Sequence, residues 1–270
     1  MAHILVTGGN GALGREIVPR LVETGHTARI MSRHPHPSNL PPGTEWAQAN
    51  LETGQGIREA VSGIDTIIHA ATSVVRHTQQ IDLDGTRLLL EQARTAGVSH
   101  VIYVSIVGID RIPFPYYRHK LAAEAVIEGA GIPWSILRAT QFHYLLDLFL
   151  SAFTKSPLLT LLPTDFKFQP ITTSEVASRL CKIVATEPAG RLPDIGGPQV
   201  HPLGELAHTW LTIRNLHRTI IHLPLPGQVA QGFRRGYNTC PDHPFGTITW
   251  TQWLHQKYSP NMSQENFPAT

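Results

Sequence analysis

Apolar and polar positions follow two spacings along the first half of the chain, one typical of strands and one of helices. His3 to Thr7 is short, apolar and β-branched and stops at a glycine pair, which predicts a buried strand. Gly14 to Glu23 has the pattern of a helix closed by Gly25, in which Pro19 should cause a kink or mark a short first segment. Five more strands are expected at 27–31, 44–49, 65–70, 100–105 and 134–138, and helices at 56–61, about 82–95 and 117–128.

Strands separated by helices at this spacing form parallel sheets that helices cover on both faces. We therefore predict an α/β fold, a doubly wound parallel sheet of the Rossmann type, over residues 1–140. Beyond residue 140 the alternation loosens, with helices expected at 145–153, 174–184, 203–213 and 228–237 and strands at 168–171, 191–195 and 219–222. Residues 141–270 should form a small mixed α/β part that adds the 191–195 strand to the main sheet and ends in about ten frayed residues.

Composition narrows the classes of protein that fit. The chain has 270 residues, 41% hydrophobic and 16% charged, which suits a globular core and excludes disorder as the main state. A net charge of +2 gives no global attraction to nucleic acid or anionic membranes, and no apolar run reaches the about 18 residues of a membrane span. The N-terminus lacks the features of a secretory signal, and the two cysteines provide no disulfide framework. We expect a cytoplasmic monomer or homodimer with a small-molecule substrate and no nucleic-acid or membrane partner.

Three glycines stand between the first predicted strand and the first predicted helix. Gly8 allows a tight turn, Gly11 lets the backbone approach a pyrophosphate, and Gly14 allows close packing of helix on strand. Amide groups at the helix N-terminus would then bind the anion. The sequence therefore predicts a dinucleotide-binding loop made of Thr7, Gly8, Asn10, Gly11, Ala12 and Leu13.

The end of the second predicted strand indicates which dinucleotide binds. An acidic residue there would bind the ribose 2′-hydroxyl of NAD. This chain has Ser32 and Arg33 instead, with no Asp or Glu in residues 24–44. A guanidinium suits a phosphate by charge and by bidentate geometry, so we predict that the cofactor is NADP(H).

These motifs, together with Tyr-x-x-x-Lys at residues 116–120, resemble the atypical short-chain dehydrogenase/reductases, in particular the NmrA-like group, over residues 1 to about 200. One departure is Asp82, which stands where the group usually has the Asn of an Asn-x-x-Gly-Thr motif. The resemblance implies residues that lie beside the adenine, residues that flank the cofactor, one that touches the ribose, and two that pass the nicotinamide. The implied residues are Asn50 and Leu51, then Ala70, Ala71 and Thr72, then Lys120, and finally Ala139 and Thr140.

The resemblance also implies three catalytic residues, Ser105, Tyr116 and Lys120. Residues 116 and 120 share a helix face, so the ammonium can lie near the phenol. A phenol with a reference pKa of ~10 is a poor acid at neutral pH, and a nearby cation favours its phenolate and helps a proton move with a hydride. Ser105 would donate a hydrogen bond to the substrate oxygen. Tyr117 lies on nearly the same face, and two prolines precede both tyrosines, so the choice of tyrosine stays open.

Other residue patterns give weaker evidence for a functional site. The 15 histidines include no His-Glu-x-x-His, so we expect no metal site, and the lack of a Gly-x-Ser-x-Gly elbow argues against a serine hydrolase. Gln141, Phe142 and Tyr144 precede the apolar helix expected at 145–153 and are candidates for the lining of a substrate pocket, as part of the C-terminal region.

Three functions fit this pattern. The first is an NADPH-dependent oxidoreductase that reduces a small apolar carbonyl, quinone or enone. The second is a non-redox enzyme on the same fold, such as an epimerase, cyclase or lyase. The third is an NADP-sensing regulatory protein without turnover. Fold alone does not choose among them, and the Ser105, Tyr116 and Lys120 set favours the first.

Overall fold

The computed structural model describes residues 1–73, 77–153 and 159–259. Its main feature is a seven-stranded sheet in the order β3-β2-β1-β4-β5-β6-β9. Neighbouring strands pair in parallel, and the chain moves to one side of β1 for β2 and β3 and to the other side for the rest. The strands are β1 (His3–Thr7), β2 (Thr27–Ser32), β3 (Thr44–Gln48), β4 (Thr66–His69), β5 (His100–Ile106), β6 (Trp134–Ala139) and β9 (Gly190–Arg191).

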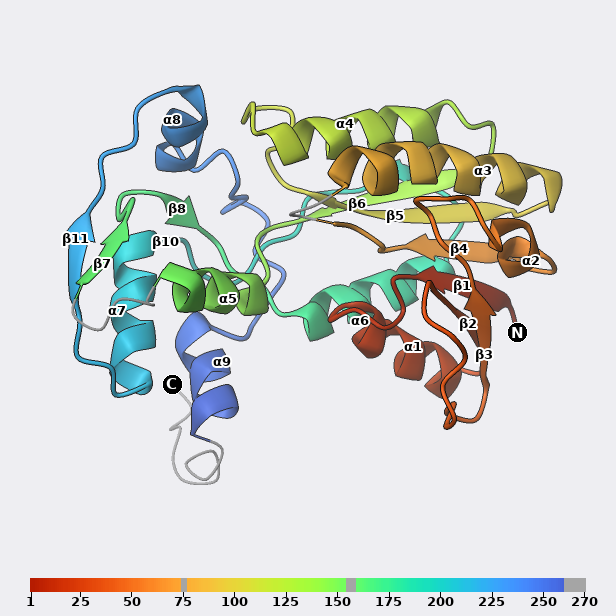
Figure 1. Cartoon of the computed structure of the whole chain (residues 1–270), viewed down its shortest axis with the longest axis horizontal. Coiled ribbons are helices and arrows are strands. Elements are labelled where there is room, and N and C mark those ends of the chain that lie inside the picture. The colour runs from red at the N-terminus through yellow and green to blue at the C-terminus, as the bar shows by residue number, and fades with distance from the viewer. Residues whose placement is uncertain (74–76, 154–158, 260–270) are drawn as a thin grey trace. The chain divides into compact units, whose positions relative to one another are not determined.

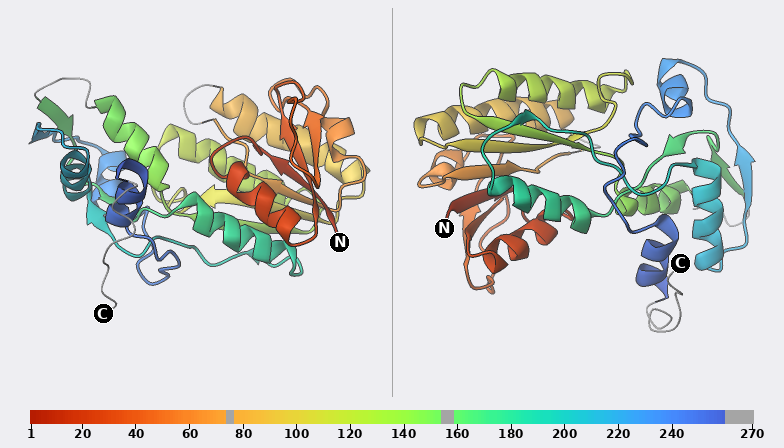
Figure 2. Two further views of the ribbon diagram at one scale, coloured as in Figure 1. Left: turned by 90° about the horizontal axis from the view of Figure 1, so that it is seen from below. Right: turned by 180° about the vertical axis from the view of Figure 1, so that it is seen from behind.

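Helices cover both faces of this sheet, which confirms the predicted doubly wound α/β fold (Figure 1). On one face lie α2 (Ile57–Val61), α3 (Gly85–Thr95) and α4 (Pro115–Glu128). On the other face α1 (Gly14–Glu23) and α6 (Thr173–Val184) lie side by side (Figure 2). Because both faces of the sheet are covered, central strands such as β1 are apolar almost without interruption.

Two helix starts differ from the expectation. The helix expected from about residue 82 begins at Gly85, and a π-helical segment, η1 (Gln79–Asp84), precedes it. The predicted single α-helix was therefore wrong at its start, because apolar spacing does not distinguish a wide turn from an α-helical one. Helix α4 starts at Pro115 rather than at residue 117, since proline is well accommodated in the first helical turn. Helix α1 continues through Pro19 without ending there.

The chain divides into two compact units that do not follow chain order. The first unit holds residues 1–138 and 173–193, and the second holds 139–172 and the described residues from 194 on. The sequence places a single boundary at residue 140, but residues 173–193 return to the first unit. They do so because α6 packs against α1 and because β9 pairs with β6.

The second unit is smaller and has its own core. Its elements are α5 (His143–Phe153), β7 (Leu159–Leu162), β8 (Lys167–Phe168), β10 (His201–Pro202), α7 (Leu203–Ile213), β11 (Thr219–His222), α8 (Gln228–Arg234) and α9 (Trp250–Tyr258). Strand β10 pairs antiparallel with β8, and β11 pairs parallel with β7. Leu150, Trp210 and Trp250 are buried in this core.

Sequence patterns predicted most but not all of the second unit. The strand expected at 168–171 is reduced to β8 and an isolated bridge between Phe142 and Ile171. Helix α8 ends at Arg234, three residues early, because the chain turns at Gly236 with a φ of 71°. Strand β7 and helix α9 were missed. The frayed end expected after residue 260 lies outside the described residues.

Candidate functional site

The glycine loop joins β1 to α1 at the carboxyl edge of the sheet. Gly8 has a φ of 68°, and a Cβ atom on it would lie 2.9 Å from Cα of Ala71. A Cβ on Gly14 would lie 2.4 Å from the carbonyl oxygen of Gly8. Both positions therefore require glycine for the backbone to close. Between them Asn10, Gly11 and Ala12 are exposed, so the top of the loop is open to a ligand, while Leu13 is buried beneath it.

Arg33 follows β2 at the same edge of the sheet and is exposed. No hydrogen bond or ion pair of its guanidinium occurs within the described ranges. By contrast, Arg29 in β2 donates to Glu45 and to two backbone carbonyls. Ser32 ends β2, and its hydroxyl accepts the amide of His34. Arg33 is thus a cation available to an anionic ligand.

A chain of buried hydrogen bonds starts at Thr7, the last residue of β1. Its hydroxyl oxygen accepts the amides of Ala70 and Ala71, each at 3.1 Å, and therefore donates its own hydrogen to Nδ1 of His69 at 2.7 Å. The protonated Nε2 of His69 then donates to the Thr86 hydroxyl at 2.9 Å. Burial lowers the pKa of His69 to about 3, with a smaller contribution from the charge of Lys120. The imidazole is therefore neutral and holds the ends of β1 and β4 against α3.

Tyr116 lies in the first turn of α4 and is buried. Its hydroxyl is 2.8 Å from that of Thr72, and the Thr72 hydroxyl donates to Oδ1 of Asp82 at 2.5 Å. Tyr117 is also buried and packs edge-on against Phe114, and burial raises the pKa of its phenol. Tyr116 is thus the tyrosine whose hydroxyl faces the end of β4.

Lys120 is 3% exposed, whereas Lys182, the other lysine of the first unit, is exposed. Its Nζ donates to the carbonyl of Val104 at 2.9 Å, lies 4.0 Å from the ring centre of Tyr103 and is 3.9 Å from Oδ1 of Asp82. Burial lowers its pKa to about 8, against the opposing charges of Asp82 and Glu124. The sequence alone does not reveal these contacts of Lys120, because Tyr103, Val104 and Asp82 lie on other segments of the chain.

Ser105 follows Val104 in β5 and is 2% exposed. Among the described residues its hydroxyl has no hydrogen-bond partner, although a buried hydroxyl normally has one. Side chains alternate along a strand, so Ser105 projects on the same face as Tyr103, over whose ring Lys120 lies. The Tyr103 hydroxyl likewise has no partner among the described residues. Two buried hydroxyl groups on one face of β5, those of Tyr103 and Ser105, thus have no partner among the described residues.

Buried ion pairs hold α4 in place. Glu124, one turn after Lys120, accepts two hydrogen bonds from Arg138 in β6, at 2.9 and 2.7 Å. Arg191 in β9 reaches both Glu124 and Glu128. The pairs fix the helix that carries Tyr116 and Lys120 to two strands of the sheet. No local sequence pattern indicates this network, because its members lie on α4, β6 and β9.

The remaining predicted cofactor and substrate residues lie in both units. Asn50 follows β3 and accepts the amide of Glu52 in a local turn, and Leu51 is buried against Gly85. Ala139 ends β6. Thr140, Gln141, Phe142 and Tyr144 belong to the second unit, where Phe142 and Tyr144 stack with ring centres 5.8 Å apart. Their part in a site stays a prediction.

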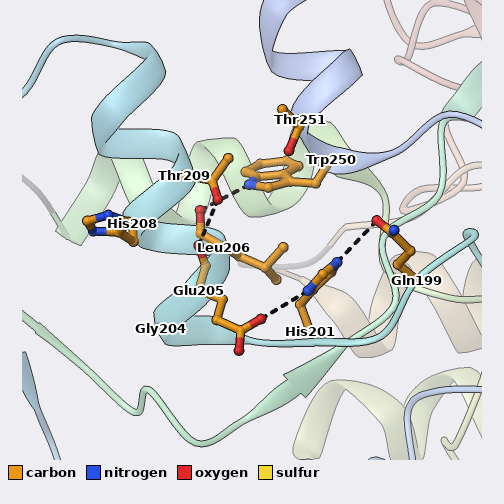
Figure 3. Close-up of a pocket in the computed structure, with 9 residues that line it drawn as sticks. All are labelled: Gln199, His201, Gly204, Glu205, Leu206, His208, Thr209, Trp250 and Thr251. Atoms are coloured by element: carbon orange, nitrogen blue, oxygen red, sulfur yellow. Dashed lines mark hydrogen bonds and ion pairs between the residues drawn. The ribbon is translucent and has the colours of Figure 1, made fainter. Parts of the chain in front are cut away.

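The second unit has a surface hollow that none of these residues lines. It is lined by residues of α7 and α9, by His201 of β10 and by Gln199 before that strand, and His201 bridges Glu205 and Gln199 (Figure 3). No sequence motif indicates a role for this hollow. No group of His, Cys, Asp or Glu that could hold a metal occurs in the described part of the chain. No helix of that part is long and apolar enough to cross a bilayer.

Comparison with known proteins decides the family. The sequence model of NAD(P)H-binding proteins matches residues 8–184, which contain the glycine loop and the Tyr116 and Lys120 helix. The chain belongs to the NAD(P)H-binding family. This family match agrees with the resemblance of the motifs to the NmrA-like group.

Three similar proteins illustrate the range of this NAD(P)H-binding family. Photosystem II assembly factor Ycf39 of Trieres chinensis is 27% identical over 52% of this chain, which spans about half (46%) of that protein's length. Ceramide reductase of Caulobacter vibrioides is 24% identical over 96% of this chain and 86% of its own. The structure of an NADPH-dependent quinone oxidoreductase of Escherichia coli superposes with a TM-score of 0.76 at 17% identity, covering 94% of this chain and 99% of that one.

The residues of the first unit fit a dinucleotide. The loop between Gly8 and Gly14 can close only without side chains, and its exposed top precedes a helix N-terminus, where unpaired amides favour anions. Arg33 supplies a cation at the same edge. This NAD(P)H-binding protein therefore has the elements for a pyrophosphate, with an exposed arginine at the same edge of the sheet.

Proposed function

We propose that the protein is an NADPH-dependent reductase that acts on a small apolar carbonyl, quinone or enone. Two contacts of helix α4 support the proposal: the Tyr116 hydroxyl meets that of Thr72 after β4, and Lys120 donates to the carbonyl of Val104 in β5. The next residue, Ser105, has a buried hydroxyl without a partner in the described chain. A hydroxyl in that state is ready to donate to an oxygen that gains charge.

Each residue has a distinct task in this proposal. Tyr116 gives its proton to the substrate oxygen, and Ser105 donates a hydrogen bond to the same oxygen as negative charge develops there. Lys120, buried beside them, provides positive charge that favours loss of the phenolic proton. Bound NADPH would supply the hydride. Gln141, Phe142 and Tyr144 are the proposed lining of the substrate pocket, and Ala139 and Thr140 the proposed neighbours of the nicotinamide.

We propose NADPH rather than NADH because Arg33 is an exposed cation with no described partner. The positions proposed to touch the cofactor are those of the glycine loop together with Ser32, Arg33, Asn50, Leu51, Ala70, Ala71, Thr72 and Lys120. The likeness to ceramide reductase over most of the chain supports a reductase. Binding of both dinucleotides by isothermal titration, followed by NADPH oxidation with ketones, quinones and enones, tests the proposal.

A second candidate is a cofactor-binding assembly or regulatory protein without turnover. The similarity to an assembly factor over half of the chain favours it. The two candidates differ in one result, because an assembly factor of this kind would bind NADPH without oxidising it in the presence of any acceptor.

A further inference from the structure

We propose that Thr72 and Asp82 form a proton-carrying link between Lys120 and Tyr116. The link is continuous in space: Tyr116 to Thr72 is 2.8 Å, Thr72 to Asp82 is 2.5 Å, and Asp82 to Lys120 is 3.9 Å. The proposal rests on the proposed reductase function for its catalytic meaning. The coupling of the groups can be measured without turnover.

The direction of each hydrogen bond follows from the number of hydrogens. Thr72 has one hydroxyl hydrogen and donates it to Oδ1 of Asp82. The Tyr116 hydroxyl must therefore donate to the Thr72 oxygen. The amide of Ser73 donates to Oδ2 of Asp82, so both carboxylate oxygens accept hydrogen bonds. Asp82 is thus held as an acceptor whose charge acts on the phenol through one hydroxyl.

Asp82 is the carboxylate best placed to serve Lys120. The side chain of Asp82 is wholly buried, and Glu124, the other carboxylate that acts on the ammonium, is occupied by Arg138 and Arg191. The neutral His69 and the phenol of Tyr103 are the other titratable groups facing this cluster. Burial lowers the pKa of Lys120 to about 8, so the ammonium can release a proton near neutral pH.

The proton transfers among Tyr116, Thr72, Asp82 and Lys120 balance. After Tyr116 has given its proton to the substrate oxygen, its phenolate takes the hydroxyl proton of Thr72. Lys120, whose Nζ is 3.9 Å from Oδ1 of Asp82, gives a proton to the Asp82 carboxylate, and Asp82 passes that proton on to Thr72. One N–H bond breaks at Lys120 and one O–H bond forms at Tyr116, while Thr72 and Asp82 end unchanged. Water then returns a proton to the Lys120 amine.

The first test is a spectroscopic titration that needs no substrate. Phenolate absorbance is followed against pH, and subtraction of the matching Tyr116→Phe protein isolates Tyr116. Asp82→Asn removes a negative charge, so we expect the midpoint of Tyr116 to fall by about one pH unit. Asp84→Asn is the matched control, because Asp84 is an exposed aspartate of the same segment that pairs with Arg87. An unchanged midpoint in Asp82→Asn would overturn the link.

The second test is kinetic, at saturating NADPH. Asp82→Asn and Thr72→Val should each lower kcat by at least about tenfold, within the range for lost general acid–base catalysis, whereas Thr72→Ser, which keeps the hydroxyl, should retain at least about a third of the rate. Thr78→Val is the control, since Thr78 bonds His119 outside the link. Wild-type rates in both variants, or equal loss in Thr72→Ser, would contradict proton transfer. If none of the tested acceptors supports NADPH oxidation by the wild type, the proposed reductase function is wrong. The spectroscopic titration alone then decides whether Thr72 and Asp82 link Lys120 to Tyr116.

Discussion

At the scale of single residues, Arg33 differs from neighbouring arginines in that its guanidinium has no partner among the described residues, and this difference makes it the candidate for binding an anionic ligand. Arg20 and Arg29 in the neighbouring elements are held by carboxylates, and Arg33 is not held by any described residue. We propose that this exposed guanidinium at the end of β2 binds the phosphate that distinguishes NADPH from NADH. On this proposal, cofactor preference depends on a very small part of the surface.

Replacing Arg33 by Ala should weaken NADPH binding by about 2 kcal/mol, because a charge-assisted hydrogen bond to phosphate is lost, and leave NADH binding nearly unchanged. Isothermal titration measures both. Arg94→Ala is the control, since Arg94 is an exposed arginine in the last turn of α3. Equal affinity of the wild type for the two dinucleotides would contradict the assignment.

At the scale of elements, the glycine loop separates binding from folding. A Cβ on Gly11 would meet only the Gly8 carbonyl, at 3.1 Å, whereas one on Gly14 would meet three backbone atoms within 2.6 Å. Gly11→Val should therefore fold but lose both dinucleotides, because its side chain covers the exposed top of the loop. Gly14→Val should fail to fold. Circular dichroism and cofactor titration distinguish the two, and normal NADPH binding by Gly11→Val would disprove the loop's role.

Helix α4 offers a second prediction at this scale. Glu124→Gln leaves the buried guanidinium of Arg138 paired only with the exposed Asp110 and should lower the free energy of unfolding by about 3 kcal/mol. Glu128→Gln is the matched control, because its pair with Arg191 is exposed and should contribute less than about 1 kcal/mol. Urea denaturation measures both changes, and equal losses would show that the buried pair does not anchor the helix.

Whether a feature could be predicted from the sequence depends on how far apart along the chain its interacting residues lie. Apolar runs and their stop signals are local, so the ends of β1, β2, β4 and β5 were located within a residue or two. The links from Thr72 to Tyr116 and from Glu124 to Arg191 join residues 44 and 67 positions apart, and no local pattern encodes them. Helix α9 had a local signal that was overlooked, the capping box of Thr249 and Gln252.

At the scale of the whole molecule, buried titratable groups make stability depend on pH. His69 stays neutral in the folded protein down to about pH 3 but takes up a proton near pH ~6.5 when unfolded. The unfolded state therefore binds more protons over this range, and stability falls as the pH falls from about 6.5 to about 3.

His69→Gln removes this titration and should flatten the decline by up to about 1.4 kcal/mol per pH unit. Denaturation midpoints of wild type and variant, taken at several pH values between about 4 and 7, measure the difference. Parallel curves for the two proteins would mean that His69 is not the group responsible. His100, whose pKa is also lowered by burial, contributes equally to both curves.

The central claim is that Tyr116 gives the proton in an NADPH-dependent reduction. It is tested by the kcat of NADPH oxidation for the wild type, Tyr116→Phe and Tyr117→Phe with the best acceptor found. We expect Tyr116→Phe to lower kcat by roughly 10²–10⁴-fold with NADPH affinity almost intact, and Tyr117→Phe to have a much smaller effect. Tight NADPH binding by the wild type without oxidation in the presence of any acceptor, or a larger loss in Tyr117→Phe, would contradict the account.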